Sequence, residues 1–111
     1  MKKSAEIDPN KYAIIFYAGG HGAVFDFPQA SGLQQIGSSI YQNGGVIASV
    51  CHGPAIFANL KVNNELLIKG RKVTAFTTSG EKLMMATDRL KEHNVPLMED
   101  LLRDVGADWQ V

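Results

Sequence analysis

A cysteine and a histidine stand side by side at the end of a short apolar run, in a setting that suits nucleophilic chemistry. The run Val46–Val50 has the small and β-branched residues of a buried strand; Cys51 and His52 follow it, and Gly53-Pro54 opens a new segment. Proline is favoured in the first turn of a helix because its missing N–H is not needed there. The order of strand, sharp turn and helix predicts a nucleophile elbow, with a thiol in place of the usual serine hydroxyl.

Cys51 is the only cysteine in the chain. At the N-terminus of a helix, the partial positive charge and the free N–H groups favour a thiolate, which is the nucleophilic form of cysteine. The alternative is a structural role, because free cysteine is among the most buried residue types and packs as a small hydrophobe. The elbow pattern favours the catalytic interpretation.

His52 is the expected general base for this nucleophile. Neighbours on a strand point to opposite faces, but a sharp turn relaxes that rule and lets both side chains reach one cleft. A nucleophile–base pair needs a third group that orients the imidazole, and Glu81 and Asp26 are the candidates. The structural alternatives are a surface His52 that caps a helix and a Glu81 that is favoured only by a helix dipole.

A glycine-rich loop, residues 19–22, follows an earlier apolar run, Tyr12–Ala18, which is typical of a strand buried on both faces of a parallel sheet. Ligands bind beyond the carboxyl ends of parallel strands, so this loop and the elbow should be neighbours. Gly20 is a candidate donor to an oxyanion, together with the N–H of the nucleophile or of the histidine after it. His21 is a candidate for binding substrate or a metal, although glycines after a strand often mark only a tight turn.

The remaining pattern alternates strands and helices, which predicts a three-layer α/β sandwich. Residues 1–11 are polar and are expected to form a flexible arm. A helix is expected over 30–43 and a short buried helix over 54–60. Strands over 65–68 and 72–76 flank Lys69-Gly70-Arg71 as a short hairpin or as strand–turn–strand. The last expected elements are a helix from 79 or 80 to 92 with Leu83, Met84 and Leu90 inward, a helix carrying Leu97, Leu101, Leu102 and Val105 and closed by Gly106, and a possible strand from 107.

Composition excludes several classes of partner. Eleven basic and eleven acidic residues cancel, so no basic field attracts nucleic acid or an anionic membrane. The sequence has neither a long apolar segment nor a charged-then-apolar leader, and one cysteine excludes an internal disulfide, so the expected location is the cytoplasm. No cysteine or second histidine stands at ligand spacing near His21, and His93 has the pattern of a solvent-facing helix residue; we therefore expect no metal site.

Several motifs together resemble the DJ-1/PfpI superfamily, and within it the Hsp31-like branch. The similarity covers nearly the whole chain from Tyr12 onward. The motifs are Ala18–Gly22, Phe25–Pro28, Ala48–Ala55, Ile68–Glu81 and Met98–Ala107.

The resemblance implies a flavodoxin-like sandwich of the class I glutamine amidotransferase type. It implies that Cys51 is the nucleophile, His52 its base, Glu81 the acidic partner of the base, and Gly20 an oxyanion donor. Members of this branch act as glyoxalase III, a D-lactate dehydratase activity that needs no cofactor and converts methylglyoxal to lactate through a hemithioacetal on the cysteine. Some members are also described as holdase chaperones.

Relative to that family, the chain reads as one domain, residues 1–111, truncated at both ends. The family's preceding segment carries a glutamate that hydrogen-bonds the cysteine, and the polar arm with Glu6 does not replace it. Exposed strand edges are templates for pairing. We therefore expect a homo-oligomer or a domain completed by another chain, and catalytic impairment is the alternative outcome.

Overall fold

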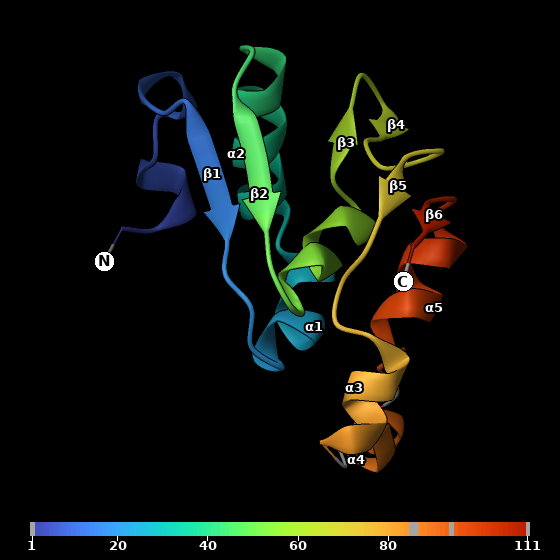
Figure 1. Cartoon of the computed structure of the whole chain (residues 1–111). Coiled ribbons are helices and arrows are strands. Elements are labelled where there is room, and N and C mark those ends of the chain that lie inside the picture. The colour runs from blue at the N-terminus through green and yellow to red at the C-terminus, as the bar shows by residue number, and fades with distance from the viewer. Residues whose placement is uncertain (1, 85–86, 94, 111) are drawn as a thin grey trace.

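The computed structural model describes residues 2–84, 87–93 and 95–110. Its first half is a β–α–β unit (Figure 1). Strands β1 (Ile14–Tyr17) and β2 (Val46–Ser49) pair in parallel, in register from Ile14 against Val46 to Tyr17 against Ser49. Helix α2 (Ser31–Gln42) connects them and covers one face of the pair. These three elements confirm the strands and the helix expected from the sequence.

Helix α2 forms because its apolar residues recur at helical spacing. Ile36 and Ile40 lie buried on the side that faces the strands, and such a stripe stabilises a helix through packing. The helix ends at Asn43, and Gly44 follows with a φ of +84°. Glycine adopts this left-handed conformation without the Cβ penalty, which is why it commonly follows a helix C-terminus.

A buried 3-10 helix, η4 (Gly53–Ala58), lies between the two halves of the molecule. It contacts β1, α1 (Gly22–Asp26) and η3 (Phe27–Gln29) on one side and α5 (Met98–Asp104) on the other. The sequence predicted a short buried helix here, and the burial is confirmed, with Ala55 and Ile56 fully inaccessible.

Of the two arrangements expected around Lys69–Arg71, strand–turn–strand is confirmed with shorter strands, Glu65–Leu66 and Lys72–Val73, and the hairpin is wrong because these strands do not pair. The structure forms a hairpin earlier, between β3 (Lys61–Val62) and β4 (Glu65–Leu66). Asn63 and Asn64 make the turn with φ values of 55° and 66°, and a two-residue turn with both central φ angles positive matches the right-handed twist of paired strands. Asparagine tolerates that conformation better than most residues with a side chain.

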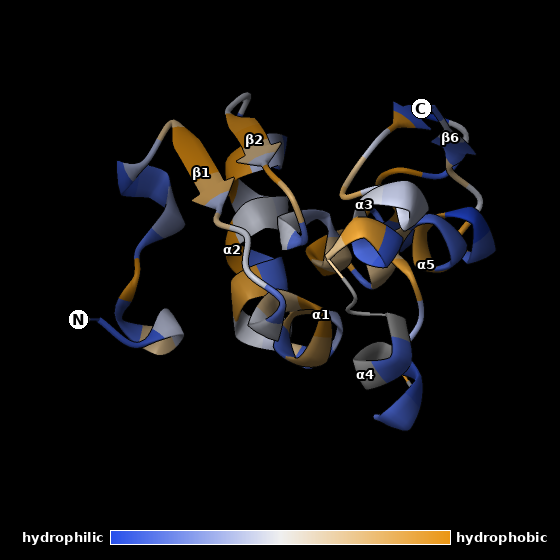
Figure 2. Ribbon diagram, turned by 60° about the horizontal axis from the view of Figure 1, so that its bottom comes forward, coloured by the Kyte–Doolittle hydropathy of each residue, from blue (hydrophilic) through white to orange (hydrophobic). Residues whose placement is uncertain are grey.

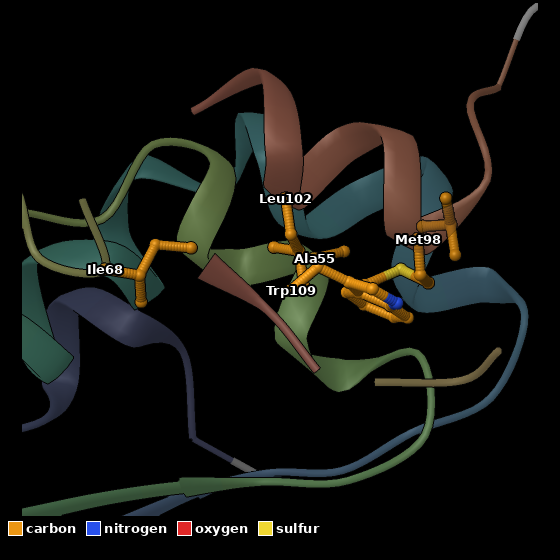
Figure 3. Close-up of a cluster of buried hydrophobic side chains, with 6 residues drawn as sticks. Ala55, Ile68, Met98, Leu102 and Trp109 are labelled. Atoms are coloured by element: carbon orange, nitrogen blue, oxygen red, sulfur yellow. The ribbon is translucent and has the colours of Figure 1, made fainter. Parts of the chain in front are cut away.

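The second half is organised around a parallel pair, β5 (Lys72–Val73) and β6 (Asp108–Trp109), which confirms a strand after residue 107. Helix α5 packs on it, and Gly106 closes that helix with a φ of 88°. The adjacent core joins residues that lie far apart in the sequence (Figure 3): Ala55, Ile68, Met98, Leu102 and Trp109, together with Val24.

The long helix expected up to Glu92 is two helices, α3 (Thr78–Leu83) and α4 (Thr87–Glu92). Leu83 and Met84, expected to face inward, are 84% and 60% exposed. Both lie at the C-terminal end of α3, which is capped at Met84. The side chain of Leu90 lies outside the described residues.

Residues 4–11 form two 3-10 turns, η1 (Ser4–Glu6) and η2 (Pro9–Lys11), which contact α2. Asp8 caps the second turn by accepting a hydrogen bond from the Asn10 N–H. The segment therefore has local structure, and the flexibility of the arm stays a prediction.

The outer face of the β1–β2 pair is bare, so the expectation of a strand buried on both faces is wrong for β1. Ile14, Phe16, Val46 and Val50 are each more than half exposed, and both strands appear as apolar ribbons at the edge of the molecule (Figure 2). The reason is topological: α2 covers the other face, and no described element lies over this one.

Together these elements define an α/β fold of the flavodoxin-like type, present as a partial sandwich with three two-stranded sheets among the described residues. None of the described helices is long and apolar enough to cross a membrane.

Candidate active site

Cys51 stands at the corner between β2 and η4, in the strained geometry that an elbow requires. Its φ is +61°, a left-handed conformation that costs a residue with a Cβ on the order of 1–3 kcal/mol and persists only when its surroundings impose it. Two backbone hydrogen bonds impose it here: the Gly53 N–H donates to the Val50 carbonyl at 2.8 Å, and the Phe76 N–H donates to the Cys51 carbonyl at 2.9 Å.

Two glycines make this corner possible. A Cβ on Gly19 would lie 2.8 Å from the Cys51 Cβ and 2.9 Å from the Val50 carbonyl oxygen. A Cβ on Gly53 would overlap the Ser49 hydroxyl and the Tyr17 carbonyl. The sequence showed these residues as turn material; their close approach to neighbouring strands could be seen only once the two strand ends were placed together.

Three side chains of the predicted site form one hydrogen-bonded chain. The Cys51 Sγ lies 3.3 Å from His52 Nδ1, and His52 Nε2 contacts the Glu81 Oε1. Because a carboxylate only accepts, Nε2 is assigned the ring proton and donates it to Glu81. The lone pair of Nδ1 then faces the thiol, which is the arrangement needed for a base that takes the thiol proton.

Glu81 is delivered to the site by the first turn of α3. Thr77 caps that helix, its hydroxyl accepting a hydrogen bond from the Gly80 N–H at 3.0 Å. The acidic side chain thus lies near the positive end of the helix dipole, and it is buried with His52. Asp26, the other candidate partner of the base, is exposed.

Aromatic rings enclose His52. The Phe76 ring lies at a centroid distance of 4.5 Å and 32° from the imidazole plane, and the His21 ring lies at 4.3 Å. A base held between rings and hydrogen-bonded at both nitrogens has one orientation and little contact with water, which strengthens its electrostatic interactions. Phe76 was missed as a site residue, since an isolated phenylalanine carries no chemical signal in a sequence.

The glycine-loop residues lie beside the elbow, as the topology predicted. His21 Nε2 lies 3.2 Å from the second carboxylate oxygen of Glu81, and its side chain is 38% exposed. Gly20 has a φ of +102° and is exposed. The role of Gly20 as an oxyanion donor and the role of His21 in substrate binding stay predictions.

One cavity of about 460 Å³ opens at the nucleophile, between β2 and the chain that follows β5. Cys51 and Pro54 form one wall, and Thr74, Phe76 and Thr77 form the other. The thiol therefore faces a space that is accessible to a small molecule.

The fold and the site together define a class: α/β proteins with a cysteine at a strand–helix elbow and a histidine–glutamate pair hydrogen-bonded behind it. The chain belongs to the DJ-1/PfpI family, which matches residues 2–104.

Its relatives confirm the resemblance to the Hsp31-like branch. The chain is 44% identical over 111 residues to "Glyoxalase 3" of Candida albicans, covering 98% of this chain and 47% of that protein. It is 43% identical over 111 residues to "Glutathione-independent glyoxalase HSP31" of Saccharomyces cerevisiae, with the same coverage of 98% and 47%. The crystal structure of glyoxalase III from Candida albicans is similar with a TM-score of 0.92 and 43% identity, covering 97% of this chain and 46% of that one. The chain thus spans about half the length of the curated relatives it matches.

Proposed function

We propose that this chain carries the nucleophilic half of a glutathione-independent glyoxalase, which converts methylglyoxal to lactate by water addition without a cofactor or a metal. The observation that carries the proposal is the unbroken chain of contacts from the Cys51 Sγ through His52 to Glu81, with the thiol open to a cavity. The names of the relatives, glyoxalases that match 98% of this chain, support the same reaction.

The first step of the proposed reaction uses the geometry at the thiol. His52 Nδ1 takes the thiol proton, and the thiolate attacks the aldehyde carbon, forming a C–S bond. The oxygen gains the negative charge, and the backbone N–H groups of Gly20 and of the elbow are the proposed donors to it. Glu81 stabilises the imidazolium through its hydrogen bond to Nε2.

The second step moves hydrogen within the adduct. A base removes the proton from the carbon that carries sulfur and a proton is returned to the adjacent carbon, so the former aldehyde carbon is oxidised to a thioester and the ketone is reduced to an alcohol. Water then cleaves the thioester, and lactate and the free thiol result. Before this step the His52 imidazolium gives the thiol proton to the oxygen of the adduct, which completes the hemithioacetal. The neutral His52, close to the sulfur, is then the proposed base, and the hydroxyl proton of the hemithioacetal passes to the ketone oxygen as the thioester forms.

The test is lactate formation from methylglyoxal by the wild-type chain and by Cys51→Ser. We expect the variant to lose the activity while keeping its circular dichroism spectrum and melting temperature, because the serine hydroxyl is a weaker nucleophile in a nearly isosteric side chain. His93→Asn is the matched control and should retain activity. Full activity in Cys51→Ser would contradict the role of the thiol.

We further propose that the working form is a homo-oligomer or a domain completed by another chain. The bare outer face of β1 and β2 supports this, because an apolar sheet face is normally covered. A covering chain would also be the source of a carboxylate beside Cys51. Sedimentation velocity tests the proposal: self-association that Phe16→Lys reduces is expected, and a monodisperse monomer with a cooperative melt at low concentration would contradict it.

The same bare face favours one second function, a holdase chaperone. In that case suppression of client aggregation should survive Cys51→Ser and fall in Phe16→Lys. If both variants suppress aggregation equally well, the face is not the binding surface. A catalytically impaired member of the family is the remaining alternative; it would show neither activity. The single free cysteine supports the proposed cytoplasmic location, since that compartment keeps thiols reduced.

A further inference from the structure

Glu81 is held by two imidazoles, of which the proposed reaction uses one. His52 Nε2 contacts one carboxylate oxygen, and His21 Nε2 lies 3.2 Å from the other. One potential ligand atom from each of these three residues lies within 4.8 Å of the others. From the sequence His21 was a candidate metal ligand without a second ligand at nearby spacing; the fold supplies His52, at the end of a different strand, and Glu81.

We propose that these three side chains form an inhibitory zinc site at the base of the nucleophile. The inhibitory effect rests on the proposed function, whereas zinc binding does not. Two imidazole nitrogens and one carboxylate oxygen are a ligand set of zinc, which is commonly held by three protein ligands with a fourth position open. At Zn–N and Zn–O distances of about 2.0–2.2 Å, tetrahedral ligands lie about 3.4 Å apart, close to the observed separation of His21 and Glu81.

Charge and access also favour a divalent cation at this place. Glu81 is inaccessible to solvent, and two imidazoles, which are neutral unless protonated, contact its carboxylate oxygens. A cation between the three groups would compensate the buried carboxylate. Glu81 and His52 are closed off, but the 38% exposed side chain of His21 gives the ion a route from solvent.

The two nitrogens of His52 point in different directions, which determines what the ion would do. Nε2 faces Glu81 and Nδ1 faces the Cys51 Sγ. A metal on the Nε2 lone pair forces the single ring proton of the neutral imidazole onto Nδ1. His52 then donates to the sulfur and cannot take a proton from it. Zinc should therefore stop turnover while leaving the thiol uncoordinated and open to the cavity.

Binding is measured first, without reference to turnover, by titrating the folded chain with Zn²⁺ against a chromophoric chelator. Loss of an outer-shell partner alone typically costs about 10- to 100-fold in metal affinity, so His21→Asn, which removes a ligand, should weaken binding at least tenfold. His93→Asn, outside the three-residue cluster, is the matched control and should bind as the wild type does. Equal affinity in His21→Asn and the wild type, or no binding by the wild type, would overturn the proposal.

Two further measurements locate the ion relative to the thiol. In the cobalt-substituted chain we expect ligand-field bands without a thiolate-to-cobalt charge-transfer band, and iodoacetamide should still alkylate Cys51 at saturating Zn²⁺. A charge-transfer band together with full protection of Cys51 would mean that the ion sits on the sulfur, which overturns the assignment. Methylglyoxal turnover without zinc is assayed separately, so a chain that binds zinc but makes no lactate would contradict the proposed function alone.

Discussion

Helix η4 and strand β1 are both rich in apolar residues, but they differ in burial. Helix η4 is buried on all sides, with Ile56 and Ala55 fully inaccessible. Strand β1 buries Tyr17 but leaves Ile14 and Phe16 63% and 59% exposed. The support behind the nucleophile is thus built entirely from described residues, whereas the sheet in front of it is covered on one face only. The corner that holds Cys51 is thus positioned by contacts within this chain, while the outer face of the sheet stays exposed in it.

The largest expected effect comes from opening a cavity under the elbow. Ile56→Ala should lower the free energy of unfolding by about 2–5 kcal/mol, because it removes buried methyl groups and leaves a void. Ile14→Ala, the matched change on the bare face, should alter it by about 0.5 kcal/mol or less. Urea unfolding measures both variants. Equal losses would mean that the two segments do not differ in burial in solution.

The burial of Tyr17 on the inner face of β1 can be tested by its ionisation at high pH. Burial raises the pKa of Tyr17 from its ordinary value of 10.0 to about 12, and its hydroxyl donates to the Leu33 carbonyl at 2.6 Å. Because the folded state resists ionisation, this contribution to stability is complete below pH 10 and is lost as the pH rises from 10 to about 12. The loss should reach about 2.7 kcal/mol.

Unfolding of wild type and Tyr17→Phe at pH 9 and near pH 12 measures this difference, since the phenylalanine variant lacks that part of the pH dependence. Tyr12→Phe, on a 45% exposed ring of the same segment, is the matched control and should follow the wild type. If Tyr17→Phe keeps the full alkaline loss, Tyr17 is not the buried titrating group.

The smallest effect on stability is expected at the bare face itself. Phe16→Lys should change the unfolding free energy of the isolated chain by about 0.5 kcal/mol or less, because the Phe16 side chain is exposed to solvent and does not pack in a core. Denaturant melts at a low protein concentration, where association does not contribute, measure this. A loss as large as that of Ile56→Ala would show that Phe16 is already covered within one chain.

Local patterns predicted most of the site and part of the fold. The elbow at Cys51, helix α2 and the approach of the glycine loop followed from short-range spacing and from the rule that parallel strand ends meet at one edge. The contact between His52 and Glu81 did not follow from spacing. Glu81 lies on α3, and the position of α3 depends on where the preceding strand, β5, lies in the fold. The resemblance to the family supplied this contact.

The wrong predictions share a physical cause: each concerns the tertiary partner of a segment, which its own sequence does not specify. The hairpin was misplaced although Gly70 does turn, with a φ of 76°. The reason is pairing: β4 pairs with β3, and β5 finds its partner, β6, more than thirty residues later. The exposure of one face of β1 could not be predicted from its apolar sequence. Such a run indicates that burial is favourable, but not which element covers each face.

The hydrogen bond from the Phe76 N–H to the Cys51 carbonyl joins two parts of the chain that belong to different sheets, since β2 and β5 do not pair. That amide is therefore a natural reporter in hydrogen–deuterium exchange. Protection of the Phe76 amide measures how often the corner that holds the thiol separates from the segment that leads to Glu81. A partner or an ion that stabilises the site should slow the exchange of this amide without contacting it.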